Sequence, residues 1–342
     1  MLSYTLRRLN LLFFTLLMLT IVSFSLSYWF PGDVLTNLSG ILSPTPEQTL
    51  ALTELYNLEQ SIFHQYFAYL KQILSGNFGV SIASKELISQ KLLTYLPATV
   101  ELCLMALMIA FISGTPLGFL AANFHNKPID RAIMVFTMLG YSIPVFWLAL
   151  ILIMVFSITL SWLPSAGQLN LLYDIKHITG FKMVDIVLSD TPNKTQALLD
   201  ATKHIILPAL TVALAPMTIF IRMARTSMLE VLDSNYIKAA RAKGLSQMRI
   251  VYNHGIRNAI IPVIRQMGLN FANLVTLAMI AEVIFDWKGV GKWLINSISQ
   301  NDYTAISGGL LGLAAFTFMI NIITDLLYAA LNPLERYKKH VA

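Results

Sequence analysis

The sequence predicts an all-α polytopic membrane protein with six transmembrane helices. Its 342 residues are 56% hydrophobic and only 12% charged, whereas a soluble domain carries about 25% charged residues. So few charges cannot cover a water-exposed surface, and much of the surface is therefore expected to face lipid. Apolar stretches near the roughly 20 residues that span a bilayer core of about 30 Å lie at about 9–30, 99–122, 132–160, 204–224, 261–284 and 305–331.

The distribution of arginine predicts that both termini are cytoplasmic. Segments 1–8, 123–131, 222–265 and 332–342 hold 15 of the 24 Lys and Arg, including all ten Arg. The loops on the opposite side hold nine Lys and no Arg. Basic residues accumulate in cytoplasmic loops, so these four segments are expected inside. The first apolar run, from Leu11 to Phe30, exceeds the core of a cleaved signal peptide and lacks a clear small-residue cleavage site. An uncleaved anchor is therefore favoured over a signal peptide.

The first outer loop, at 31–97, carries signals for helices. Thr45 suits an N-cap, Pro46 the first helical position and Glu47 the first turn. A helical spacing of large apolar residues then predicts a face that lies on the membrane or packs on the spans: Phe63, Tyr66, Phe67, Leu70 and Leu74. The stretch 75–81 ends this pattern with turn residues. Glu101 is expected to open the second span, where a helix N-terminus favours an acid.

The inner loop at 225–260 predicts a short helix, a glycine turn and a second helix. The residues from Asn235 to Lys243 favour a helix, and Gly244 suits the left-handed residue that ends one. Ser246 can cap the following helix. Pro262 predicts a break before span five, because it lacks a backbone N–H. Three alanines keep the first helix thin, so that it can enter a cleft on another protein: Ala239, Ala240 and Ala242.

The sequence lacks the motifs of an ATPase or of a metal enzyme. It has no Gly-x4-Gly-Lys-Ser/Thr loop for phosphate, and the nearest string, at 286–293, lacks the first Gly and the final hydroxyl residue. The six histidines form no i, i+4 pair and no metal site is predicted. No Gly-x-Ser-x-Gly elbow is present. Cys103 is the only cysteine and is read as a buried apolar residue. Nucleic acid binding is not predicted.

The inner loop resembles a family signature. Ala239-Ala240, then Gly244, then Ile-Ile-Pro ending at Pro262 is similar to the EAA loop of ABC-importer permeases, with Lys238 at the usual Glu position. Further stretches resemble the dipeptide and oligopeptide permeases: Pro31-Gly32-Asp33, 75–81, 96–99, 142–147, 285–291 and Asn301-Asp302-Tyr303. Three others are similar to the Sap branch of peptide-transport systems: 178–181, 188–192 and 277–280.

The resemblance implies one permease domain over 1–342 with the MetI-like fold of type I ABC importers. It implies half a channel in a bacterial inner membrane, completed by a second homologous permease. Two ATP-binding subunits would bind ATP and Mg and dock on the coupling loop, and a periplasmic binding protein would deliver substrate. The implied substrates are peptides, including cationic antimicrobial ones; polyamines such as putrescine, haem or dipeptides remain alternatives. The residues implied to contact the ATPase are Tyr236, Lys238, Ala239, Ala240, Arg241, Gly244 and Leu245.

Two polar stripes occur within predicted spans. Gln266, Asn270 and Asn273 share one face of span five. A second stripe lies along one face of span six, at Thr317, Asn321, Thr324 and Tyr328. Both stripes are expected to point away from lipid, because an unpaired polar group there costs several kcal/mol. They either bond helix to helix or line a hydrated path; the path is expected from Gln266, Asn270, Asn273 and Asn321. An ion-coupled secondary transporter is the rival class, but no internal repeat supports it.

Overall fold

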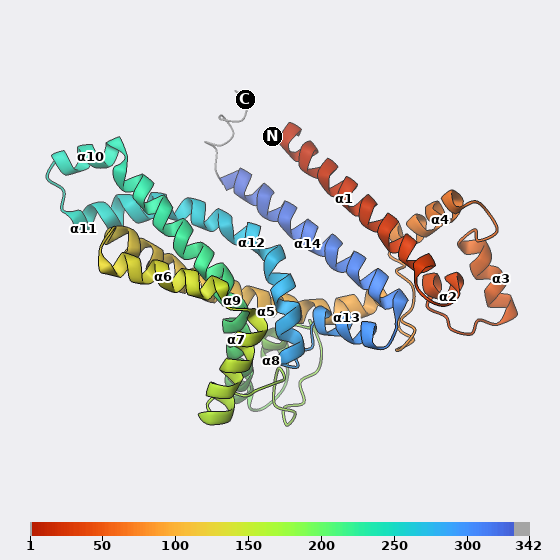
Figure 1. The fold of residues 1–342 in the computed structure, drawn as a ribbon. Coiled ribbons are helices and arrows are strands. Elements are labelled where there is room, and N and C mark those ends of the chain that lie inside the picture. Colours follow the sequence, from red (N-terminus) through yellow and green to blue (C-terminus); the bar gives the residue numbers. More distant parts are fainter. Residues whose placement is uncertain (1, 332–342) are drawn as a thin grey trace. The chain divides into compact units, whose positions relative to one another are not determined.

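The computed structural model describes residues 2–331, with side chains described except at 2–9, 12, 269 and 325–331. Within this part all regular structure is helical, apart from one isolated bridge between Val80 and Leu87. Figure 1 shows the succession of long and short helices. The predicted all-α class is therefore confirmed. The predictions for the side chain of Tyr328 and for segment 332–342 lie outside what the structure describes.

Helices coincide with all six predicted spans. The long elements are α1 (Leu2–Trp29), α5 (Ile88–Asn123), α6 (Pro128–Ser142) with α7 (Val145–Leu152) and the π-helix η1 (Ile153–Thr159), α9 (Lys194–Asp233), α12 (Arg257–Ile284) and α14 (Tyr303–Leu331). The shorter ones are α2 (Val34–Ser39), α3 (Pro46–Leu55), α4 (Ile62–Leu74), α8 (Lys182–Leu188), α10 (Asn235–Ala242), α11 (Gln247–Arg249), the π-helix η2 (Ile250–Ile256) and α13 (Val290–Ser299).

Helix length and composition give fewer membrane crossings than the six apolar stretches of the sequence. Among the described residues, α5, α9 and the Tyr303–Thr324 part of α14 are long and apolar enough to cross singly. Two bent pairs raise this number to five if each pair is one span. In α1 the described apolar part, Phe13–Trp29, is shorter. The count of six therefore stays a prediction.

Two compact units make up the chain, Met1–Thr99 with Lys288–Ala342 and Val100–Trp287. In the first unit α14 packs against α1 and α13. Its loops are fixed by Asp302, which is 1% exposed. The Asp302 carboxylate accepts hydrogen bonds from Ser81 Oγ at 2.5 Å and from the backbone amides of Ile82 and Ala83 at 3.1 Å each. Two stretches that carried the family resemblance, 75–81 and 301–303, are thus joined by one buried carboxylate.

The second unit is built around α9, which packs against α12, α6, α7 and α8. Glycine allows a close approach of α5 to α9, because a Cβ at Gly118 would lie 2.4 Å from the carbonyl oxygen of Ile221. Ser227 Oγ on α9 donates to the carbonyl oxygen of Ala259 on α12 at 2.9 Å. The helix that leads into the inner loop and the helix that leaves it are therefore packed on each other directly.

The expectation that Glu101 opens a helix is wrong. Helix α5 begins at Ile88, so its 36 residues extend about 54 Å and Glu101 lies well inside it. The buried Glu101 carboxylate instead accepts the backbone N–H groups of Lys182 and Met183 at 3.0 and 2.9 Å. These amides start α8 and have no partner within their own helix. The apolar pattern alone could not place this boundary, because the first turns of α5 are polar.

A second carboxylate orders the loop before α8. Asp185 is fully buried and accepts hydrogen bonds from Thr179 N at 2.7 Å, Thr179 Oγ1 at 2.6 Å and Gly180 N at 3.1 Å. Burial by itself raises the pKa of Asp185, but these hydrogen bonds outweigh burial and hold the pKa below its ordinary value. The polar loop at 161–203 is thus internally organised.

Two predicted spans are bent. Pro128–Ser142 and Val145–Thr159 meet at an angle of 101°, where Pro144 lacks an N–H and Ile143 adopts the extended backbone usual before proline. By contrast, the predicted break at Pro262 is wrong, because α12 continues through it. The π-helix η2 lies directly upstream, and such local adjustments let a helix accommodate proline. The bend in this segment, 51°, falls after Gly268 instead.

Candidate functional site

The inner loop folds as its sequence predicted, into a helix ended by glycine. Helix α10 stops at Ala242 and Gly244 adopts a φ of +77°. The amide of Gly244 donates to the carbonyl of Arg241 at 3.0 Å, and that of Leu245 donates to the carbonyl of Ala240 at 3.3 Å. This pair of bonds is a Schellman motif, which satisfies carbonyls that a helix end leaves free. Ser246 Oγ then accepts the amide of Arg249 at 3.4 Å and caps α11.

Most of the predicted coupling residues point to solvent. Only Ile237 anchors α10, with no exposed surface. Tyr236 is 47% exposed, and its hydroxyl accepts Asn258 Nδ2 at 3.0 Å. Lys238 Nζ lies 2.9 Å from Asp233 Oδ1 in a solvent-exposed pair. The remaining predicted residues divide into exposed Ala239, Arg241 and Gly244 and half-buried Ala240 and Leu245. The segment thus exposes small residues, Ala239 and Gly244, between longer polar side chains.

The loop continues as helix into the first part of span five, up to the bend after Gly268. Helices α11, η2 and α12 follow one another without an interruption from Gln247 to Ile284. Within η2, Ile250 and Gly255 are buried, and a Cβ at Gly255 would lie 2.6 Å from Met228 Cε on α9. A displacement of α10 therefore reaches α12 through continuous helix. Single-turn π-helices frequently occur at functional sites.

An ion pair that the sequence analysis missed lies at the inner ends of α6 and α9. Arg225 Nε lies 2.6 Å and Nη2 lies 2.8 Å from the two oxygens of Asp130, which is 3% exposed. The amide of Asn126 donates to the same carboxylate at 2.9 Å, and His125 Nδ1 lies 3.1 Å from Arg225 Nη2. We call this group the inner clamp. Its signal in the sequence was Asp130, a lone acid within a basic inner segment.

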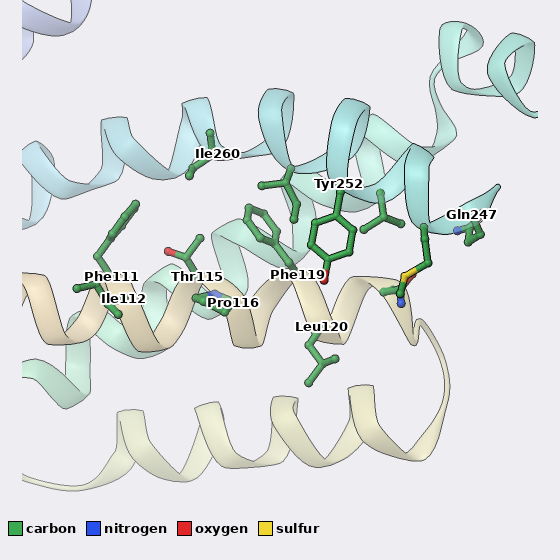
Figure 2. A pocket seen from close by; sticks show the side chains of 13 residues that line it. Phe111, Ile112, Thr115, Pro116, Phe119, Leu120, Gln247, Tyr252 and Ile260 are labelled. Atoms are coloured by element: carbon green, nitrogen blue, oxygen red, sulfur yellow. The ribbon is translucent and has the colours of Figure 1, made fainter. Parts of the chain in front are cut away.

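An apolar cavity of about 560 Å³ lies between α5 and the segment that follows α11. Figure 2 shows Phe111, Thr115 and Phe119 of α5 facing Tyr252 and Ile260 across it. Thr115 Oγ1 is buried and has no hydrogen-bond partner. Asn123, the last residue of α5, and Gln247, the first residue of α11, both line this cavity, so the start of α11 lies near the end of α5.

The three residues of the polar stripe in span five differ in how far they are buried. Asn270 is 3% exposed, and its Nδ2 donates to the carbonyl of Gln266 in its own helix at 2.8 Å. Gln266 is half-buried and Asn273 is exposed. Asn321 belongs to the other unit; its Oδ1 is buried without a hydrogen-bond partner. The structure therefore groups the three span-five residues along one helix and does not bring Asn321 into the same unit.

The described residues hold no candidate metal-binding cluster. No cluster of three His, Cys, Asp or Glu among them could hold a metal ion. Cys103 is buried with no exposed surface, which agrees with its interpretation as an apolar core residue.

Comparisons with known families cover nearly the whole chain. Residues 114–337 match the family described as binding-protein-dependent transport system inner membrane component. Residues 1–103 match the N-terminal part of such membrane components. The methionine ABC transporter MetNI, in an inward-facing conformation, has a chain that superposes with a TM-score of 0.51 at 17% identity, over 69% of this chain and 93% of that one. This likeness confirms the MetI-like fold.

Curated relatives extend the likeness over full length. The chain is 42% identical, over 98% of both chains, to the "peptide transport system permease protein SapB" of Salmonella typhimurium. It is equally identical, over the same shares, to the "putrescine export system permease protein SapB" of Escherichia coli K12. The "di/tripeptide transport system permease protein DppB" of Pseudomonas aeruginosa is 40% identical over 99% of this chain and 100% of its own length. The predicted Sap resemblance is confirmed.

Proposed function

This chain belongs to the family of inner membrane components of binding-protein-dependent transport systems, and from that membership we propose that it forms half of the channel of an ATP-driven peptide transporter. It is a multi-pass permease subunit of an ABC transporter. ATP hydrolysis falls to separate subunits, consistent with the absence of a phosphate loop from the sequence. Both termini and the coupling loop lie in the cytoplasm of a bacterial inner membrane, as the confinement of arginine supports.

The proposed assembly has four further kinds of contact. A second homologous permease completes the channel, two ATP-binding subunits dock on the coupling loops, a periplasmic binding protein delivers substrate, and lipid surrounds the spans. Closure of the ATPases moves α10, and the helical segment from Gln247 to Gly268 carries that motion into the first part of span five. Rigid-body movement of the spans then alternates access between the two sides.

One observation carries this proposal, namely the exposed α10 projection. The helix ends in a Schellman motif, and its last turn exposes Ala239 and Ala242 beside the longer Arg241, followed by Gly244. Ala239 on its surface leaves room for close backbone approach. An ordinary cytoplasmic loop would not require such a defined end. A helix that docks in a cleft of a partner does require one, because the cleft admits only a helix of limited width that enters in one direction.

Peptides are the proposed substrates, since two of the relatives carry peptide or di/tripeptide transport in their names. Putrescine is the second candidate, because the equally similar Escherichia coli relative is named for putrescine export. The deciding experiment reconstitutes the chain with its partner permease, its ATPases and its periplasmic binding protein in vesicles. Stimulation of ATP hydrolysis by peptides but not by putrescine supports the first candidate, and the reverse result supports the second. Purification of an active transporter without ATPase subunits would support an ion-coupled mechanism instead.

We propose that the exposed part of the span-five stripe lines the substrate path. Replacing Asn273 with leucine is expected to leave the yield of complex unchanged and to lower or alter substrate-stimulated transport. The reason is that Asn273 is exposed within this chain, while amides offer both donors and acceptors to a peptide that has left water. The measurement compares complex yield with transport per assembled complex.

Asn270→Leu is the matched comparison, because Asn270 is buried on the same stripe. Its amide bonds within its own helix, and its replacement is expected to act on packing and therefore on yield. If both variants lower yield and leave transport per complex unchanged, the stripe holds helices together and does not line a path.

A further inference from the structure

Helix α4 is fastened to α1 through one face. Tyr66 Oη lies 2.9 Å from Thr20 Oγ1, and Tyr69 Oη lies 2.8 Å from Ser23 Oγ. The ring of Phe24 packs against both tyrosines, with centroids 5.6 Å apart in each case. These contacts are all within the first unit, where Phe24, Tyr69 and their neighbours form a buried cluster. The helix drawn beside α1 in Figure 1 is therefore held there by specific hydrogen bonds.

The opposite face of α4 is apolar and uncovered. Phe63 is 73% exposed, Phe67 65% and Leu74 79%. Their spacing of four and seven residues places them on one stripe of the helix. The sequence analysis grouped Tyr66 with these residues, but the structure turns Tyr66 toward α1. Contiguous exposed apolar patches on a chain usually mark an interaction surface.

The position of α4 along α1 indicates what covers this stripe. Thr20 lies nine residues before Trp29, the last residue of α1, which is about 14 Å at 1.5 Å per residue. Half of a bilayer core is about 15 Å. Trp29 is 77% exposed and has the amphipathic ring typical of a membrane boundary. Thr20 therefore lies near the middle of the core, while Tyr28, which bonds Gln65, lies beside Trp29 at its edge, so this part of α4 lies between these two depths, within one leaflet.

The helix also crosses α1 rather than following it. Neighbouring residues of α4, Gln65 and Tyr66, bond to Tyr28 and Thr20, which are eight positions apart on α1. Val22 and Met18 of α1 are themselves 52% and 57% exposed; two positions from Thr20, they lie on the face of α1 turned away from α4, so this part of α1 is apolar on its open side as well. Lys71 is exposed in the last turn of α4, where a long basic side chain can reach headgroup phosphates.

We propose that α4 is an interfacial amphipathic helix, and that Phe63, Phe67 and Leu74 lie among the acyl chains of the leaflet at the C-terminal end of α1. The partner of this surface is lipid rather than a delivering protein. Part of the first outer loop is then membrane-embedded, and it fixes the tilt and rotation of α1 from the side. The inference depends neither on the transported substrate nor on the coupling role of α10.

Site-directed spin labelling tests the inference in the full-length chain. Single cysteines are introduced at Phe63→Cys, Phe67→Cys and Leu74→Cys in a Cys103→Ser background, in vesicles of phosphatidylethanolamine and phosphatidylglycerol. Leu171→Cys is the control, because Leu171 is equally apolar and 94% exposed but lies in the polar loop at 161–203. Labels on α4 are expected to collide with oxygen, relative to a water-soluble nickel complex, several-fold more often than the label at 171.

Two outcomes overturn the inference. If the three α4 labels collide with the nickel complex as readily as the label at position 171, the stripe faces water. If they are shielded from both oxygen and the nickel complex, protein covers the stripe. Because all three residues are exposed in the structure, the cysteine substitutions do not disturb packing, and the yield of each variant in the membrane is expected to equal that of the Cys103→Ser parent.

Discussion

A Gly244→Val variant is expected to insert normally into the membrane and to lose most ATP-driven transport. The φ of Gly244 is +77°, a conformation that costs an L-residue roughly 1–2 kcal/mol and a β-branched residue more. Nothing lies within 4 Å of a Cβ at this position, so the added side chain meets no atom of this chain. The effect therefore comes from the backbone, through loss of the turn that ends α10. The measurements are transport, ATP hydrolysis and recovery of ATPase subunits with the purified chain.

Gly244→Asn is the matched control, because asparagine tolerates the left-handed region. Near-normal transport by this variant, beside the loss in Gly244→Val, assigns the defect to backbone conformation rather than to side-chain bulk. The docking face is probed separately by Ala239→Trp. Ala239 is exposed, so a large ring there obstructs a partner and not the chain itself, whereas Ala239→Ser keeps the surface small. Normal transport by both Gly244→Val and Ala239→Trp would show that α10 does not couple to an ATPase.

The inner clamp is expected to be the most sensitive polar contact near the coupling loop. Asp130→Asn removes the charge that Arg225 pairs with at 2.6 and 2.8 Å and keeps the size of the side chain. Hydrogen bonds to charged groups contribute about 1.5–3 kcal/mol each, and removing one partner of a buried pair costs more than the pair contributes. A lower thermal midpoint is therefore expected for the purified complex. More ATP is also expected to be hydrolysed per substrate moved, because α9 leads directly into α10 and loses its tie to α6.

Two controls accompany this variant: an exchange of the two clamp charges and the loss of a solvent-exposed ion pair. Asp130→Arg combined with Arg225→Asp is expected to recover part of the stability that either single change removes. Asp233→Asn breaks the Lys238–Asp233 pair, whose side chains are 57% and 85% exposed; surface pairs contribute little, and no measurable change is expected. An Asp130→Asn complex with unchanged thermal midpoint and unchanged coupling ratio would contradict a mechanical role for the clamp.

Local features of the chain followed from residue chemistry. Thr45 caps α3 as predicted, in a reciprocal pair with Gln48, because the cap needs only a short-range hydroxyl and the amides beside it. Gly244 ends α10 for the same kind of reason, since glycine alone adopts positive φ without a steric penalty. The six apolar stretches predicted helices, because lipid requires every backbone group to bond within its own segment. The family resemblance likewise rested on short segments, above all the inner loop from Ala239 to Pro262.

Long-range contacts were beyond the reach of the sequence. Periodicity could not show that Glu101 caps α8 or that Asp302 binds the loop at 81–83, because partners 81 and 220 residues apart leave no spacing to read. Nor could it separate Tyr66 from Phe63 and Phe67, since all three fit one helix pattern and only the packing of α1 divides them. The sequence by itself determined the membrane class, the helices and the turn at Gly244, whose energies are local. The tertiary structure decided which buried charges pair and which apolar faces stay open, because those energies exist only when distant segments meet.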